Sequence, residues 1–181
     1  AKHVVEPLLE DTNRIMEHRG RMETAFKRLP ADQRAELLAV ADEERDKHQS
    51  DQNGVVVYTV GDLYDAAKAI KPVFDAKMRA LAAPLGLREV AAIAPNTTPS
   101  PALVLPDLKP MARAADKAMG DYGGANSDGG PPVSRVLDVV RACFILPNPA
   151  ALLRLIELVR AHPDLLIVRL KNRFITPTAT G

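Results

Sequence analysis

Basic side chains recur at helical spacing in the segment DLKPMARAADKAMGD, residues 107–121. Lys109, Arg113 and Lys117 follow one another at intervals of four residues, so a helix would place them on one face, about 6 Å apart along its axis. Three cations in such a row can bind successive phosphates of a nucleotide. The competing interpretation is a solvated charged face, in which these cations have acidic neighbours.

A carboxylate follows in the apolar run VLDVVRACFI, where Asp138 is the acidic residue. A buried carboxylate without a partner is unfavourable by several kcal/mol. We therefore expect Asp138 either to pair with Arg135 or Arg141, or to bind a metal ion. Because Mg²⁺ is often held by a carboxylate together with substrate phosphates, Mg²⁺ is the expected cofactor.

The third group of candidate residues lies near the end of the sequence. The run LLIVRLK, residues 165–171, has the composition of a strand. Alternation along that strand would place Arg169, Lys171 and Arg173 on one side of it. These three cations form a second candidate site for phosphates.

In order and spacing, these elements resemble the synthetase domain of the RelA/SpoT family over about residues 107–181. That domain has a basic helix that begins with Lys-Pro, an aspartate ahead of the first strand, and a Lys-Asn-aromatic segment before a Pro/Thr-rich loop. The last of these corresponds here to KNRFITPTATG, although Ala179 stands where many members have proline. The resemblance implies an α+β fold in which a helical N-terminal region precedes a mixed-sheet nucleotidyltransferase domain.

The same resemblance implies transfer of pyrophosphate from ATP to the 3′-hydroxyl of a guanine nucleotide, as in (p)ppGpp synthetases. It assigns the basic residues to phosphates and the aspartate to the metal. The ATP-phosphate ligands would be Lys109, Arg113 and Lys117, the Mg²⁺ ligand Asp138, and the ligands of donor or acceptor phosphates Arg169, Lys171 and Arg173. The family's glutamate base and base-stacking tyrosine have no counterpart before Gly181. We therefore expect a segment of a longer protein, with the catalytic base beyond it.

The first part of the chain is expected to be a helical region over residues 1–83. Asp32 is a candidate cap for a short helix. Thr59 begins a capping-box pattern before a longer helix over about residues 61–83, which contains Pro72. Residues 84–106 hold five prolines and predict a linker before the domain of residues 107–181. The expected inward face of the longer helix is Leu63, Ala66, Ala67, Ile70, Phe74, Met78 and Leu81.

The second part of the chain predicts a helix packed on a sheet. RACFIL, residues 141–146, is the first expected strand, and LLIVRLK is the second. Between them a helix over residues 150–162 is expected, with Asn148 as its cap and Pro149 in its first turn. Cys143 is the single cysteine, and its apolar surroundings predict a buried structural thiol.

Composition excludes several classes of protein. Hydrophobic residues make up 46% of the chain, enough for a core, and no apolar run reaches the about 20 residues of a membrane span. Residues 107–181 hold 10 basic and 7 acidic side chains, a modest excess that suits a small anion better than a long nucleic acid. The four histidines are scattered. Composition therefore predicts a soluble protein. The family resemblance implies a location in the bacterial cytoplasm, and the scattered histidines do not match the paired His-Asp metal ligands of the family's hydrolase half.

Two alternatives stay open on the sequence. One is a catalytically inactive interaction module, whose helical N-terminal region binds a protein partner. The other is a toxin or secreted effector of the same fold that modifies another acceptor, such as an adenine nucleotide or tRNA. Binding of tRNA would depend steeply on salt, whereas binding of a nucleotide would not.

Overall fold

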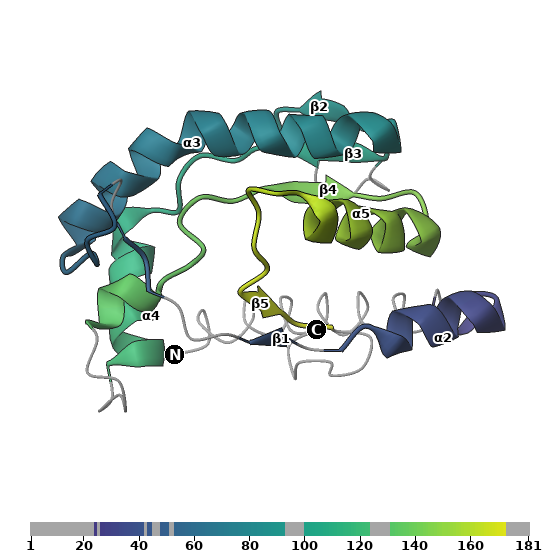
Figure 1. The fold of residues 1–181 in the computed structure, drawn as a ribbon, viewed down its shortest axis with the longest axis horizontal. Coiled ribbons are helices and arrows are strands. Elements are labelled where there is room, and N and C mark those ends of the chain that lie inside the picture. Colours follow the sequence, from purple (N-terminus) through teal and green to yellow (C-terminus); the bar gives the residue numbers. More distant parts are fainter. Residues whose placement is uncertain are drawn as a thin grey trace, which may run out of the picture. The chain divides into compact units, whose positions relative to one another are not determined.

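The computed structural model describes residues 24, 26–41, 43–44, 48–50, 53–92, 100–123 and 131–172. The chain divides into two compact units, a larger one of residues 46–162 and a smaller one of residues 1–45 with 163–181. This division differs from the boundaries that composition suggested at residues 83/84 and 106/107. The described residues combine helices and short strands, so the architecture is α+β, as expected (Figure 1).

The long helix α3, Val60–Ala82, begins at the predicted capping box. The backbone N–H of Asp62 donates to Oγ1 of Thr59 at 3.1 Å, and the backbone N–H of Thr59 donates to Oδ2 of Asp62 at 3.0 Å. Pro72 lies inside the helix, also as predicted. The inward assignment of Ile70 was wrong, since this residue is 51% exposed. Ile70 lies in the middle of α3, between two groups of buried residues. The N-terminal group is Leu63, Tyr64 and Ala67, and the C-terminal group is Met78, Leu81 and Ala82.

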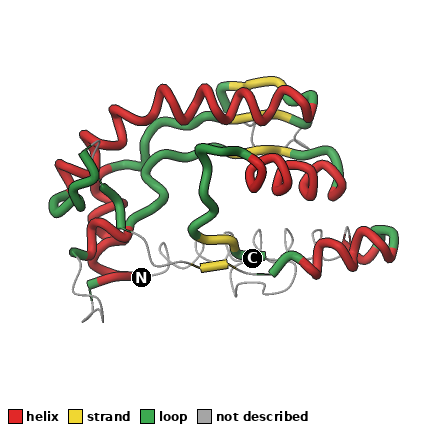
Figure 2. The backbone as a smooth tube through the Cα atoms, viewed as in Figure 1, coloured by secondary structure: helices red, strands yellow, loops and turns green. Residues whose placement is uncertain are grey.

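Three strands form the mixed sheet of the larger unit (Figure 2). β2, Arg88–Val90, runs parallel to β3, Ala102–Val104, and β3 runs antiparallel to β4, Cys143–Ile145. The interval 84–106, which was expected as a linker, therefore supplies two strands, including the fully buried central one. A buried thiol at Cys143 was a wrong prediction, because this residue starts the edge strand β4 and is exposed.

Small residues let α4, Met111–Tyr122, pack closely in the larger unit. Ala114 and Ala118 of α4 are buried against η2, Pro132–Arg135, and against α3. Valines from the segment that follows η2 complete this cluster. Its buried members are Val57, Leu63, Tyr64, Ala67, Ala114, Ala118, Val136 and Val139.

The last helix of the larger unit is α5, Pro149–Ala161, and it confirms its predicted start. The backbone N–H of Ala151 donates to Oδ1 of Asn148 at 2.9 Å, and Pro149 occupies the first turn. The helix ends at Ala161, and the backbone N–H of the following residue, His162, donates to the carbonyl of Val159. No residue of α5 is fully buried, although α5 contacts α3.

The smaller unit joins two distant parts of the chain. β1, Glu43–Glu44, pairs antiparallel with β5, Arg169–Leu170. Nδ2 of the buried Asn172 donates to the carbonyls of Leu37 at 2.6 Å and Val40 at 2.9 Å, at the end of α2, Ala31–Ala39.

Two local predictions failed in this unit. Asp32 does not cap α2, because the helix begins after Pro30 without a side-chain cap. The strand expected over residues 165–171 is confined to β5, and it pairs with β1 rather than with the strand at RACFIL. The physical reason is that strand propensity does not specify a pairing partner.

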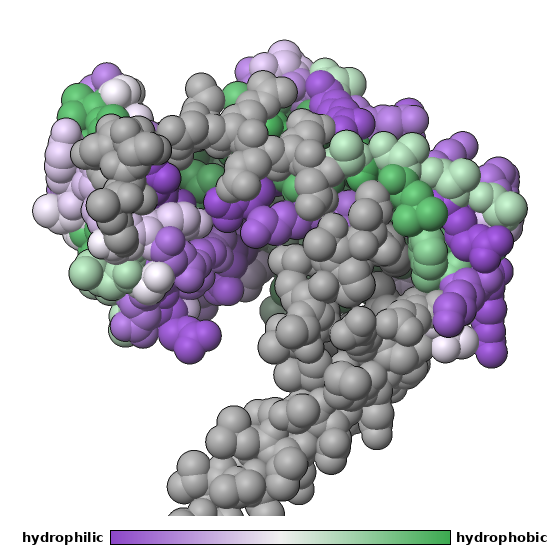
Figure 3. Space-filling model, turned by 90° about the horizontal axis from the view of Figure 1, so that it is seen from below, coloured by the Kyte–Doolittle hydropathy of each residue, from purple (hydrophilic) through white to green (hydrophobic). Residues whose placement is uncertain are grey.

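Hydrophobic residues are exposed on several of the described elements. On the face drawn in Figure 3, hydrophilic and hydrophobic residues are interspersed. None of the described helices has the length and apolar character needed to cross a membrane. The large hydrophobic residues that are exposed come from several elements: Leu38, Val55, Tyr58, Ile70, Val73, Val90, Met111, Met119 and Leu166.

Candidate functional site

Two of the predicted phosphate ligands meet at the predicted metal ligand. Nζ of Lys109 donates to Oδ2 of Asp138 at 2.9 Å, and Nζ of Lys117 donates to the same oxygen at 3.0 Å. Both distances are typical of charge-assisted hydrogen bonds. We call Lys109, Lys117 and Asp138 the Lys–Asp–Lys cluster. It carries a net charge of about +1, because two ammonium groups face one carboxylate.

The backbone around Lys109 is fixed from two directions. Its N–H donates to the carbonyl of Val139 at 2.9 Å, in the segment that follows Asp138. Its carbonyl accepts a hydrogen bond from the hydroxyl of Tyr64 on α3. Lys109 lies before α4, which begins at Met111, so the prediction that it shares a helical face with Lys117 was wrong. The two ammonium groups nevertheless converge on one oxygen.

The helix α4 positions Lys117. This residue directly precedes Ala118, which is buried in the core, so its backbone is held where α4 packs on η2. The side chain of Lys117 is 26% exposed, compared with 15% for Lys109 and 43% for Asp138. The cluster thus lies at the edge of the apolar core, partly open to solvent.

The two lysines lower the pKa of the Asp138 carboxylate. Partial burial alone would raise the pKa of Asp138, but the hydrogen bonds from Lys109 and Lys117, and then their positive charges, lower the pKa below its ordinary value of 3.8. Asp138 is therefore ionised at neutral pH. Its second oxygen, Oδ1, is buried and has no hydrogen-bond partner among the described residues.

Tyr64 belongs to the same environment, and sequence reasoning missed it. Burial raises its pKa above the ordinary value of 10.0, the charge of Arg141 opposes this rise, and the charge of Asp138 adds to it. Tyr64 is neutral at physiological pH and acts here as a donor to the Lys109 carbonyl. A buried tyrosine hydroxyl needs a partner, which is the signal that the sequence offered, but the sequence could not say where that partner lies.

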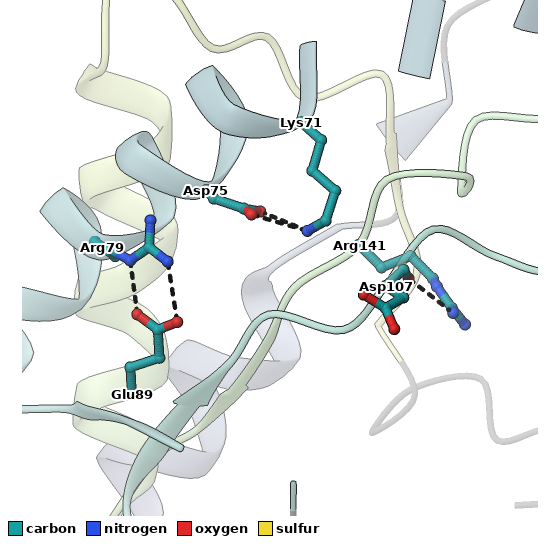
Figure 4. A network of polar contacts seen from close by, with 6 residues as sticks. All are labelled: Lys71, Asp75, Arg79, Glu89, Asp107 and Arg141. Carbon is teal, nitrogen blue, oxygen red and sulfur yellow. Dashed lines mark hydrogen bonds and ion pairs between the residues drawn. The ribbon is translucent and has the colours of Figure 1, made fainter. Parts of the chain in front are cut away.

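Arg141 had been considered a partner for Asp138. In the structure its Nη2 donates to the backbone carbonyl of Asp107 at 3.5 Å, a long hydrogen bond (Figure 4). The positive charge of Arg141 acts on the pKa of Tyr64. The ion pairs of Asp138 are made by Lys109 and Lys117 instead.

Two further ion pairs in Figure 4 stabilise the scaffold near α3 and β2. Lys71 pairs with Asp75 within α3, at 2.8 Å. Arg79 of α3 binds both oxygens of Glu89 in β2, at 2.6 and 3.0 Å. This bidentate arrangement ties the end of α3 to the first strand of the sheet.

Arg113, the third predicted ATP-phosphate ligand, is not part of the Lys–Asp–Lys cluster. Its side chain is exposed on α4 and makes no hydrogen bond or ion pair within the described part of the chain. Arg169 and Lys171 are exposed residues of the smaller unit. Arg173 lies outside the described residues.

The Lys–Asp–Lys cluster offers a magnesium ion a single carboxylate, that of Asp138. Among the described residues, no group of three or more His, Cys, Asp or Glu side chains is arranged to hold a metal ion. Mg²⁺ commonly binds one or two carboxylates and completes its coordination with phosphate oxygens and water. Oδ1 of Asp138 is enclosed and Oδ2 is held by both lysines, so Asp138 could serve such a site only after a phosphate ligand has taken over the two ammonium groups and the carboxylate has moved.

Comparisons with family models, with curated proteins and with solved structures find no match to this chain.

Proposed function

We propose that this chain is part of a nucleotide pyrophosphokinase that transfers pyrophosphate from ATP to the 3′-hydroxyl of a guanine nucleotide. The observation that carries the proposal is the convergence of Lys109 and Lys117 on one oxygen of Asp138. Residues that the RelA/SpoT-like motifs assign to phosphate and to metal, and that stand 21 and 29 positions apart, are in direct contact. This proximity is what such a reaction centre requires.

The chemistry of the cluster suits a phosphate oxygen. Two ammonium groups that share one carboxylate oxygen can equally share one oxygen of a phosphate, which carries the same kind of charge. Arg113, one turn before Lys117 on α4, has an exposed guanidinium that can extend the row along a polyphosphate. In this assignment Lys109, Arg113 and Lys117 bind the ATP phosphates.

Asp138 is the proposed ligand of Mg²⁺. When bound, the ion would neutralise charge on the transferred pyrophosphoryl group. The contribution of the protein is to orient the polyphosphate and to supply fixed positive charge, which is the main source of catalysis in phosphoryl transfer. Arg169, Lys171 and Arg173 of the smaller unit are the proposed ligands of donor or acceptor phosphates.

The first test is binding of ATP with Mg²⁺, measured by isothermal titration calorimetry. Lys117→Gln should weaken binding about tenfold, because it removes one of the two converging ammonium groups. Lys68→Gln is the matched control, since Lys68 is an exposed lysine on α3 whose ammonium pairs with Asp65. Equal affinities of the two variants would refute the assignment of Lys117, and absence of binding by the wild-type protein would refute the proposal.

The second test identifies the acceptor in the full-length protein. With γ-labelled ATP and Mg²⁺, label should move to GDP or GTP, and it should move more slowly in the Lys117→Gln variant because that variant binds ATP more weakly. Transfer to an adenine nucleotide or to tRNA instead would identify the toxin or effector alternative. If no acceptor is labelled and ATP does not bind, the interaction module is the better interpretation.

A further inference from the structure

Oδ2 of Asp138 lies where an incoming anion would place an oxygen. It accepts hydrogen bonds from both lysines, at 2.9 and 3.0 Å, and so completes the hydrogen-bonding geometry that a phosphate oxygen would adopt between them. The carboxylate and a phosphate therefore cannot both occupy this position. Any anion that binds between Lys109 and Lys117 must first displace Asp138.

The displaced carboxylate would then need a new partner. Oδ1 of Asp138 already has no hydrogen-bond partner among the described residues. The loss of both ammonium groups would therefore leave a partly buried negative charge uncompensated. A divalent cation delivered with the anion supplies that compensation. Conversely, a cation alone approaches a cluster whose net charge is already positive, so it binds weakly until the anion has drawn the lysines away.

We infer that Asp138 acts as an internal competitor for the anion site, so that the cluster binds a metal–polyphosphate complex but resists both the free anion and the free metal. This inference rests on the proposed function and adds a selection step to it. By linkage, the anion and the metal must increase each other's affinity by the same factor. Asp138 is the residue through which that coupling passes, because it exchanges its lysine partners for the metal.

The test uses pyrophosphate as the probe and calorimetry as the readout, with the full chain. Affinity for pyrophosphate is measured in EDTA and again with saturating Mg²⁺, for the wild type and for Asp138→Asn. Complex formation between Mg²⁺ and pyrophosphate in solution is the same for both proteins. The ratio of the two affinities, compared between variants, therefore reports the contribution of Asp138 alone.

Asp138→Asn should bind metal-free pyrophosphate about tenfold more tightly than the wild type, because the competing charge is gone. The preference of the wild type for pyrophosphate with Mg²⁺ should disappear in the same variant. Asp116→Asn is the matched control, because Asp116 is exposed on α4, next to Lys117, and its carboxylate makes no hydrogen bond or ion pair in the described structure. It changes the net charge equally and should behave like the wild type.

Two outcomes would overturn the inference while leaving the proposed function intact. Equal metal-free affinities of wild type and Asp138→Asn would show that the carboxylate does not compete. Weaker binding by Asp138→Asn would show that it positions the lysines instead. Failure of all variants to bind pyrophosphate, with or without Mg²⁺, would refute the proposed function itself. Circular dichroism checks the fold of each variant, and Asp138→Ser replaces Asp138→Asn if the latter is unfolded.

Discussion

The ion pairs of the Lys–Asp–Lys cluster should be measurable as coupling energies in the absence of any ligand. Double-mutant cycles isolate each pair: Lys109→Met with Asp138→Asn, and Lys117→Met with Asp138→Asn. Each cycle needs the free energy of unfolding of four proteins, obtained by urea denaturation. The buffer must contain no phosphate, because an anion would compete for the same lysines.

The magnitudes follow from exposure. Fully exposed ion pairs contribute about 0.2–1 kcal/mol. Asp138 is 43% exposed, so solvent screening keeps both pairs near this range, but Lys109 is only 15% exposed and Lys117 is 26% exposed. We therefore expect a coupling energy of about 1 kcal/mol for Lys109–Asp138 and about 0.5 kcal/mol for Lys117–Asp138.

Salt and ligand provide the internal checks of this prediction. Both coupling energies should fall as the ionic strength rises toward about 1 M, where the screening length is about 3 Å. Saturating pyrophosphate with Mg²⁺ should lower them as well, if the lysines exchange partners as inferred. Coupling energies indistinguishable from zero in low salt for both pairs would contradict the geometry of the cluster.

Three further predictions concern the scaffold. Tyr64→Phe removes the donor to the Lys109 carbonyl and should lower the free energy of unfolding by about 1 kcal/mol in urea denaturation. Burial holds the pKa of Tyr64 above 10.0 against the opposing charge of Arg141, so this contribution is complete below pH 10.0 and is lost as the pH rises through the folded-state pKa. The stability difference between wild type and variant should therefore close only in strong alkali. Asn172→Asp replaces the donor to the Leu37 carbonyl with an acceptor, and should lower hydrogen-exchange protection in α2 about tenfold or more, whereas unchanged protection would refute the role of Asn172. Thr59→Ala should lower the free energy of unfolding by about 1 kcal/mol and Thr59→Ser by less, because serine keeps the cap; equal losses would argue against the capping box.

The parts of the fold that sequence predicted correctly are those set by local interactions. The capping box at Thr59 joins residues three positions apart, and the Asn148 cap with Pro149 does the same for α5. These signals are complete within a few residues, so the sequence carries them in full. The prediction that Ile70 is buried was wrong, because the apolar periodicity of a helix does not show where along the helix another element will pack.

Long-range pairing was not readable from the sequence. The run at residues 165–171 has the composition of a strand, yet only Arg169–Leu170 pairs, and its partner β1 lies more than a hundred residues upstream. The interval 84–106 was expected as a linker because of its prolines. Its buried residues Ala102–Val104 form the central strand of the sheet instead. Composition alone did not distinguish a short buried strand from a connection.

The candidate site lies between these two cases. A carboxylate in an apolar run must have a partner, and this reasoning identified Asp138 as a residue to explain. The sequence offered an ion pair and a metal as alternatives, and the nearby arginines as the partners. The structure shows the ion pair, but its partners are the lysines that the motifs assign to phosphate. The ion pair and the metal need not be rival explanations of Asp138, because they can be its partners one after the other. The carboxylate cannot bind both lysines and a phosphate-bound metal at the same time. In the proposed mechanism they are the unliganded and liganded states of one site. The affinity of Asp138→Asn for metal-free pyrophosphate is the measurement that separates this proposal from a purely structural ion pair.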